Sequence, residues 1–237
     1  MKITWTFHCV VPLAQQAAHM AHAKTLGLPT IGTAGGIRER VAVVGGDPFL
    51  YRHLDELRAF DGEIWAVNGA WKVLRHAGID ATFYSVDASE MIAPLCGGAR
   101  AILADVCHPD TFAAVASAEV VSTVVHGPTS ATASPYVALT RGHTHLTYYG
   151  CSSTFTPDGR SHAYKVERRE LLDVACNGKH YITNPTMLSQ AEMLAELIRT
   201  APGVFEDRSG GLLSALVADP DYDIIAASKD IHEAIAA

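Results

Sequence analysis

The residues best suited to chemistry stand where short apolar runs of the sequence end. These positions are rich in glycine, hydroxyl and amide groups and hold only two carboxylates, Asp47 and Asp87. In an open parallel sheet, ligands bind beyond the carboxyl ends of the strands, where the strand order reverses. We therefore expect one glycine-lined pocket for a phosphorylated small molecule, formed by residues 45–47, 68–69, 87–89, 126–130 and 150–153.

The first of these stretches, VVGGDPFL at 43–50, has the form of a strand, a glycine turn and a helix. Gly45 and Gly46 let the backbone approach a ligand, and the N–H groups of the following helix suit an anion. Pro48 fits a first helical turn. The negative charge of the Asp47 carboxylate repels a phosphate unless the side chain caps the helix or holds a metal. The stretch matches neither G-x-G-x-x-G nor the P-loop pattern, so a purely structural turn is an equal alternative.

Two segments, VVGGDPFL and WAVNGAWKVLRHAGIDATFYSVDAS (65–89), resemble the 6-hydroxymethylpterin diphosphokinase MptE-like family. The similarity extends over roughly residues 38–199. Gly45, Pro48 and Leu50 match the first element of the family, and Asn68, residues 78–80 and Asp87 match the later ones. The chain departs from the family at Ser152, where an Asp is usual, and at Asp47 and Phe49, where Gly and Ser are expected.

The resemblance implies a Rossmann-like, nucleotide-binding transferase. The family includes ATP-dependent pterin pyrophosphokinases and proteins thought to glycosylate flagellin, and it is similar to bacterial sialyltransferases that use CMP-sugars. The first hypothesis is therefore transfer of a pyrophosphoryl group from ATP to a small hydroxymethyl acceptor, with Mg²⁺ held by Asp87 and Asp47 as a second candidate ligand. The missing Asp at position 152, and the absence of Lys or Arg at the predicted strand ends, count against it.

The second hypothesis is glycosyl transfer from a CMP- or UDP-sugar without an obligatory metal. It needs a base for the acceptor hydroxyl, and His162 in the stretch SHAY is the candidate. A third alternative is a catalytically silent nucleotide-binding accessory protein, which the changes at Phe49 and Ser152 would suit.

The candidate residues fall into two groups. The catalytic candidates are His162, Asp87 and Ser152, with Asp87 also the metal ligand. Asn68 would read a base or ribose, and Gln190 is a further polar residue that could face the cleft. The nucleotide-binding candidates are Gly45, Gly46, Asp47, Pro48, Asn68, Gly127, Thr129, Ser130, Gly150, Ser153 and Tyr164.

The elements that must position these residues alternate along the chain. Apolar runs at 40–46, 63–70, 81–89, 100–106, 119–127 and 144–151 alternate with helical segments, which predicts βα units. Beyond residue 151 we expect a hairpin turning at Asn177-Gly178, a helix capped by Asn184, a last strand and helix over 203–217, and a surface helix in the acidic tail. The predicted fold class is α/β: a Rossmann-like, mostly parallel sheet with helices on both faces, plus a C-terminal hairpin-and-helix elaboration.

This organisation predicts an N-terminal extension over 1–37 with a short helix, a Rossmann-like domain over 38–218 and a tail over 219–237. A hairpin lid is expected at about 152–183. The apolar N-terminal stretch at 3–11 is a strand that could need cover from a second subunit, so a homo-oligomer is one expectation.

Composition limits the classes of protein that fit. Of the 237 residues, 49% are hydrophobic and 18% are charged, which is typical of a globular chain, and the net charge of −7 argues against a general nucleic-acid binder. The five cysteines are scattered and form no C-x-x-C pair. With no signal-peptide pattern and no apolar run of membrane-spanning length, we expect a cytoplasmic protein with small-molecule partners, a nucleotide and an acceptor.

Overall fold

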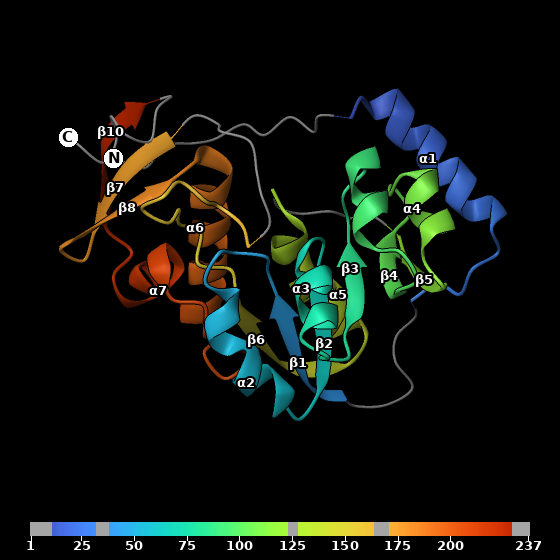
Figure 1. The fold of residues 1–237 in the computed structure, drawn as a ribbon, viewed down its shortest axis with the longest axis horizontal. Coiled ribbons are helices and arrows are strands. Elements are labelled where there is room, and N and C mark those ends of the chain that lie inside the picture. Colours follow the sequence, from blue (N-terminus) through green and yellow to red (C-terminus); the bar gives the residue numbers. More distant parts are fainter. Residues whose placement is uncertain (1–10, 32–37, 123–127, 164–170, 229–237) are drawn as a thin grey trace.

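A computed structural model describes residues 11–31, 38–122, 128–163 and 171–228. Its centre is a seven-stranded sheet in which every neighbouring pair is parallel, in the order β5-β4-β3-β2-β1-β6-β9 (Figure 1). The strands are β1 (Arg38–Val44), β2 (Glu63–Val67), β3 (Thr82–Ser85), β4 (Arg100–Ala104), β5 (Ser117–Val121), β6 (His143–Tyr149) and β9 (Phe205–Asp207). The predicted α/β fold with a parallel sheet is confirmed.

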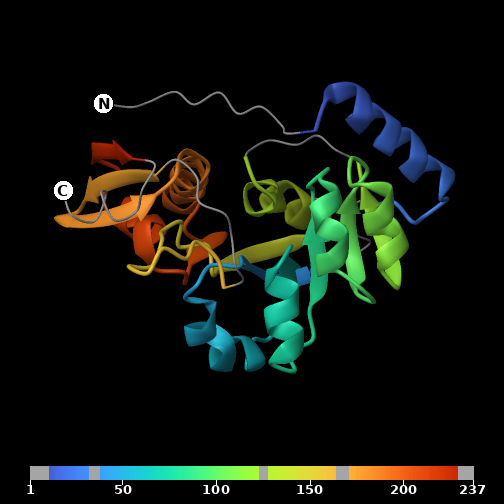
Figure 2. The same ribbon diagram turned by 45° about the horizontal axis from the view of Figure 1, so that its top comes forward.

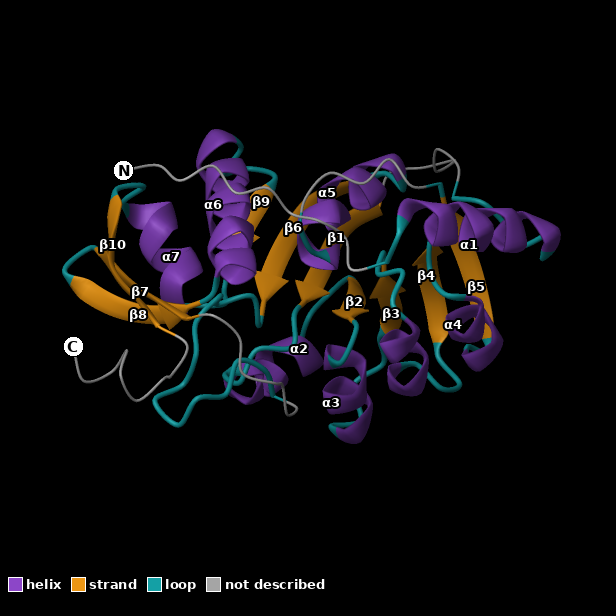
Figure 3. Ribbon diagram, turned by 90° about the horizontal axis from the view of Figure 1, so that it is seen from above, coloured by secondary structure: helices purple, strands orange, loops and turns teal. Residues whose placement is uncertain are grey.

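Helices cover both faces of this sheet, as predicted. From β1 to β5, each new strand pairs with the strand before it and the sheet grows in one direction. Right-handed crossover connections then place all the connecting helices on one face of the sheet. The chain next returns to the other side of β1, which puts the following helices on the opposite face. Figure 3 shows α2 (Leu54–Arg58), α3 (Ala70–His76) and α4 (Pro109–Ala114) on one side of the sheet, and α5 (Ser130–Thr140) and α6 (Pro185–Thr200) on the other.

Because both faces are covered, the central strands are continuous apolar runs. The four residues from Val41 to Val44 have no exposed surface. On the face under α5, three aromatic side chains fill the core. Trp65 and Tyr84 lie with ring centroids 5.4 Å apart, and the Tyr148 hydroxyl reaches the Ser134 hydroxyl of α5 at 3.4 Å.

A smaller antiparallel sheet follows, in the order β10-β7-β8, formed by β7 (Leu171–Cys176), β8 (Lys179–Thr183) and β10 (Tyr222–Ser228). β7 and β8 turn at Asn177 and Gly178, both with positive φ, so the predicted hairpin turn is confirmed. Figure 3 shows α7 (Gly211–Ala218) beside α6 and against this small sheet.

The surface helix expected in the acidic tail is wrong as far as residue 228, because this segment forms β10 and pairs with β7. The free edge of β7 provides hydrogen-bond partners for the backbone groups of 222–228. This pairing stabilises a strand more than local helical preference stabilises a helix. The rest of the tail lies outside the described residues.

The N-terminal extension contains the expected helix, α1 (Leu13–Thr25), which Figures 1 and 2 show at the β4–β5 end of the sheet. The His19 ring contacts the Val106 carbonyl oxygen through Nδ1 at 3.0 Å, and Thr30 forms a parallel bridge to Val120 of β5. The extension therefore covers the outer edge of β5. The predicted strand at 3–11 falls almost wholly outside the described residues. In the part of the chain that the structure describes, no helix has the length and apolar character needed to cross a bilayer.

Candidate ligand-binding edge of the sheet

The strand order reverses at β1, which lies between β2 and the much later β6. Since all seven strands are parallel, their carboxyl ends share one edge of the sheet, and the reversal beside β1 is where open α/β sheets bind ligands. We call the residues after β1, β2, β3 and β6, together with the start of α5, the switch-point edge. Most of the predicted site residues lie on it.

At the centre of this edge, Gly45 and Gly150 pack directly against each other. A Cβ on Gly45 would lie 2.4 Å from the Gly150 carbonyl oxygen, and a Cβ on Gly150 would lie 2.3 Å from that of Gly45. The Gly45 N–H donates to the Tyr149 carbonyl at 2.8 Å, and the Asp47 N–H donates to the Gly150 carbonyl at 3.1 Å. Both glycines are therefore required for the contact between the ends of β1 and β6, whatever else the turn does.

Asp47 has a structural task in the same turn. Its carboxylate is buried and accepts two backbone hydrogen bonds, from the Phe49 N–H to Oδ1 at 2.8 Å and from the Ser152 N–H to Oδ2 at 2.9 Å. It thus caps the turn that leads into the helical segment η1 (Leu50–His53), with Pro48 buried beside it, and ties that turn to the loop after β6. This explains a carboxylate in a glycine turn without invoking a metal.

The two serines after β6 are also enclosed. Ser152 is fully buried, its Oγ has no hydrogen-bond partner, and its carbonyl oxygen accepts from the Leu213 N–H of α7 at 3.2 Å. A Cβ on Gly211 would lie 2.7 Å from the Ser152 Cβ, so α7 closes over this position. Ser153 is buried with φ of 56°. Neither hydroxyl is open to solvent.

A chain of side-chain hydrogen bonds joins three elements of the switch-point edge. Thr129 Oγ1 donates to Gln190 Oε1 at 2.7 Å, and Gln190 Nε2 donates to Ser153 Oγ at 3.0 Å. Thr129 also forms a capping box with Thr132 at the start of α5. The Ser130 hydroxyl accepts from the Val86 N–H at 3.1 Å, just after β3. The N-terminus of α5 is therefore held above the carboxyl ends of the central strands.

Asn68 and Asp87 follow β2 and β3 on this edge. Asn68 adopts a left-handed conformation, with φ of 48°, and its side-chain Oδ1 is buried without a partner. Asp87 is partly exposed, and its Oδ1 accepts from the Ser89 N–H at 2.9 Å.

Sequence reasoning missed a second carboxylate near Asp87. Asp105 follows β4 and is buried, and the charges of Asp87 and Asp105 both act on the Cys107 thiol. Burial raises the pKa of Cys107 above its usual range, and the two carboxylates raise it further. The signal for Asp105 was its position at the end of the run RAILAD, which parallels that of Asp87.

Of the remaining predicted site residues, the structure describes His162 but not Gly127 or Tyr164. His162 is partly buried, and its Nδ1 lies 2.9 Å from the Ser161 Oγ. The next residue, Ala163, donates its N–H to the Gly46 carbonyl at 2.8 Å. The structure therefore brings the His162 segment to the glycine turn after β1.

Within the described ranges, no group of three or more His, Cys, Asp or Glu side chains is arranged to hold a metal ion. Asp87 could still contribute one carboxylate to Mg²⁺, which proteins commonly hold through one or two carboxylates together with phosphate oxygens. Two hollows of the surface are lined by residues outside the switch-point edge. One borders α3, and the other, of about 450 Å³, lies beside the hairpin turn at Asn177 and the start of β10.

The fold defines a Rossmann-like parallel α/β protein with a small antiparallel sheet appended. Comparison with protein-family models, curated proteins and solved structures found no match to this chain.

Proposed function

We propose that this chain is a nucleotide-binding transferase that moves a pyrophosphoryl group from ATP to a small hydroxymethyl acceptor. The observation that carries the proposal is the gathering of Asn68, Asp87 and the start of α5 at the reversal in strand order. They come from three separate parts of the chain, and each offers a different chemical group to a nucleotide: an amide, a carboxylate and helix N–H groups.

The phosphates are assigned to the N-terminus of α5. The first N–H groups of a helix have no partner within it, and its dipole favours an anion. In α5 the Thr129 side chain accepts from the Thr132 N–H, which leaves the N–H groups of Ser130 and Ala131 for a ligand. The turn after β1 is not needed for this role, because Gly45 and Asp47 already serve the contact between β1 and β6.

Asp87 is the residue that would hold Mg²⁺ together with phosphate oxygens, and the metal would neutralise charge on the transferred group. Asn68 is partly exposed, and its side-chain amide would contact a base or ribose group. Ser152 has no part in the proposal, since it is fully buried.

One observation supports glycosyl transfer from a CMP- or UDP-sugar as the second candidate. The hydrogen bond from Ala163 to Gly46 brings His162 to the switch-point edge, and Ser161 Oγ orients its ring through Nδ1. A histidine held in this way suits a general base near neutral pH.

The test is titration of ATP, CMP and UDP by calorimetry, with and without Mg²⁺, into the wild type, Asp87→Asn and Asp61→Asn. Asp61 is the matched control, an exposed aspartate just before β2 at the opposite edge of the sheet. We expect Asp87→Asn to weaken binding of ATP with Mg²⁺ by about tenfold, roughly 1.4 kcal/mol, and Asp61→Asn to leave it unchanged.

Turnover separates the candidates. Metal-dependent release of AMP from ATP supports pyrophosphoryl transfer. Metal-independent turnover of a CMP- or UDP-sugar that is lost in His162→Ala supports glycosyl transfer. Binding without either reaction identifies the accessory protein, and failure to bind any of the three nucleotides overturns the proposal.

A further inference from the structure

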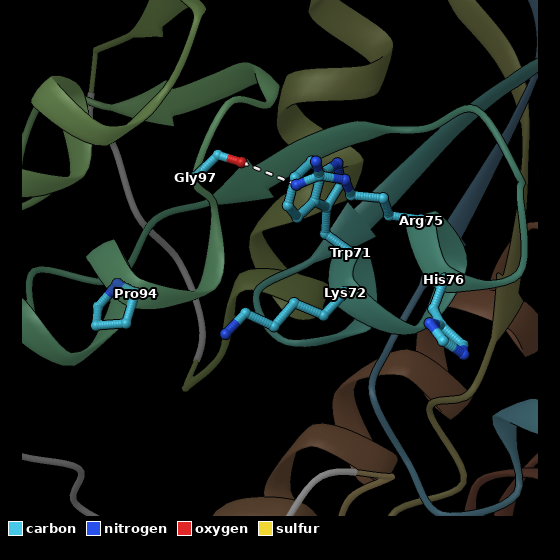
Figure 4. A pocket seen from close by; sticks show the side chains of 6 residues that line it. All are labelled: Trp71, Lys72, Arg75, His76, Pro94 and Gly97. Carbon is cyan, nitrogen blue, oxygen red and sulfur yellow. Dashed lines mark hydrogen bonds between the residues drawn. The ribbon is translucent and has the colours of Figure 1, made fainter.

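The hollow beside α3 lies on the α2, α3 and α4 face, so the seven-stranded sheet separates it from α5 and α6 (Figure 3). Its volume is about 510 Å³, within the range of about 300–1,000 Å³ common for small-molecule sites. We call it the α3 groove; it is lined by Trp71, Lys72, Arg75, His76, Pro94 and Gly97 (Figure 4).

The lining of the α3 groove is basic although the chain as a whole is acidic. Lys72, Arg75 and His76 contribute to it, and no carboxylate does, while the net charge of the chain is −7. Among the described residues, none of these three side chains has an ion pair within 4.0 Å, whereas several other arginines do, such as Arg58 with Asp55. Two uncompensated cations, Lys72 and Arg75, in one hollow favour an anionic ligand.

Arg75 is held in place before any ligand arrives. Its guanidinium carbon lies 5.0 Å from the centroid of the Trp71 ring, and its Nη1 donates to the Gly97 carbonyl at 3.2 Å. Trp71 is only 7% exposed, so it forms a fixed platform for the guanidinium. A planar fork fixed in this way loses little side-chain entropy on binding and suits the geometry of a phosphate.

Lys72 supplies a second cation on the same side of α3. Figure 4 shows its side chain extending across the groove toward Pro94. Burial raises the pKa of the Cys96 thiol, and the positive charge of Lys72 acts against this shift. The ammonium therefore lies close to the segment that contains Cys96. Pro94 adds an apolar wall on the other side of the groove from α3 (Figure 4).

We propose that the α3 groove binds a small organic phosphate monoester, with its phosphate between Lys72 and Arg75 and a flat apolar part against Pro94. A phosphate dianion matches an ammonium and a guanidinium fork, and the apolar wall distinguishes an ester from free phosphate. The site does not depend on the proposed transferase function, because none of its lining residues belongs to the switch-point edge.

The test is titration of phenyl phosphate and of inorganic phosphate at equal ionic strength into the wild type, Lys72→Gln, Arg75→Gln and Lys24→Gln. Lys24, an exposed lysine on α1, is the matched control. The Trp71 indole N–H resonance reports binding at the groove itself. We expect saturable binding of phenyl phosphate that is at least fivefold tighter than that of inorganic phosphate. It should be weakened about tenfold in Lys72→Gln and in Arg75→Gln and be unchanged in Lys24→Gln.

Arg75→Gln also removes contacts to Trp71 and Gly97, so Lys72→Gln decides the matter if the arginine variant fails to fold. Unchanged affinity in Lys72→Gln, a Trp71 resonance that does not move, or equal affinity for the two anions overturns the proposal. Asp87→Asn separates this site from the proposed nucleotide site, because it leaves binding of phenyl phosphate to the α3 groove unchanged.

Discussion

Gly45 shows how much a single residue decides at the switch-point edge. Its position leaves no room for a side chain, because the Gly150 carbonyl oxygen and the Cys151 Sγ would lie 2.4 Å and 2.8 Å from a Cβ. The first of these neighbours is backbone, which cannot rotate away as the end of a flexible side chain can.

Gly45→Ala should therefore destabilise the protein, by about 1–3 kcal/mol or more, since the ends of β1 and β6 must separate. Gly203→Ala is the control, because a Cβ there meets nothing within 4 Å, and we expect a change within about 0.5 kcal/mol. Urea unfolding of both variants measures the difference. Equal stabilities would mean that the glycine pair is not needed for packing.

The same residues mark the limit of sequence reasoning at this scale. The positions of Asn68, Asp87 and Thr129 at the ends of predicted strands or the start of a predicted helix followed from apolar runs and local turn chemistry. The structural task of Asp47 did not, because its partner Ser152 lies 105 residues further along the chain. Local patterns indicate that a turn exists but not which distant backbone it must contact.

At the scale of elements, helix caps were predictable because the capping residue and the N–H group that it binds lie within a few residues of each other in the sequence. The expected start of α6 is confirmed: the Asn184 side chain accepts from the Met187 N–H at 2.9 Å, and Pro185 occupies the first turn. The small sheet was harder to predict from the sequence, since β10 forms because it pairs with the free edge of β7 and not because of its own local preferences.

Asn184→Ala should lower the free energy of unfolding by about 1 kcal/mol, because a partly buried helix N–H loses its acceptor. Asn184→Asp retains the acceptor and should stay near the wild-type stability. Thermal and urea unfolding compare the two variants. If alanine and aspartate are equivalent, the cap contributes nothing to stability.

At the scale of the whole molecule, charged residues link strands at the edge opposite the candidate site. Glu63 of β2 lies near Arg141 and near the buried His143 of β6, with 3.6 Å between Glu63 Oε2 and His143 Nε2. Arg141 also pairs with Glu119 of β5 at 2.7 Å. His143 lowers the pKa of Glu63 most, and Trp65 and Arg141 add to this effect against the opposing influence of burial, giving a pKa of about 2.

This pKa has a defined consequence for acid stability. Because the pKa of Glu63 in the folded protein lies below its ordinary value of 4.5, the carboxylate stabilises the fold fully above pH 4.5 and loses this contribution as the pH falls toward 2. Glu63→Gln should therefore lose less unfolding free energy than the wild type between pH 5 and pH 3. Urea unfolding at both pH values measures this.

The control for the acid experiment is Glu196→Gln, which alters an exposed carboxylate on α6. It should follow the wild type across the same interval. Parallel loss of stability in the wild type and Glu63→Gln would show that the charges around Glu63 do not govern acid unfolding.

The order β5-β4-β3-β2-β1-β6-β9 also bears on how the chain is made. During synthesis, β2 to β5 can each join the strand that left the ribosome just before it, but the other edge of β1 stays without its partner until β6 emerges. At about 5–20 residues per second, the 105 residues between Asp47 and Ser152 correspond to roughly 5–20 s. For that time an apolar strand edge is open to chaperones or to other nascent chains, so the yield of protein from cells should respond to translation speed and chaperone supply more strongly than its final stability would suggest.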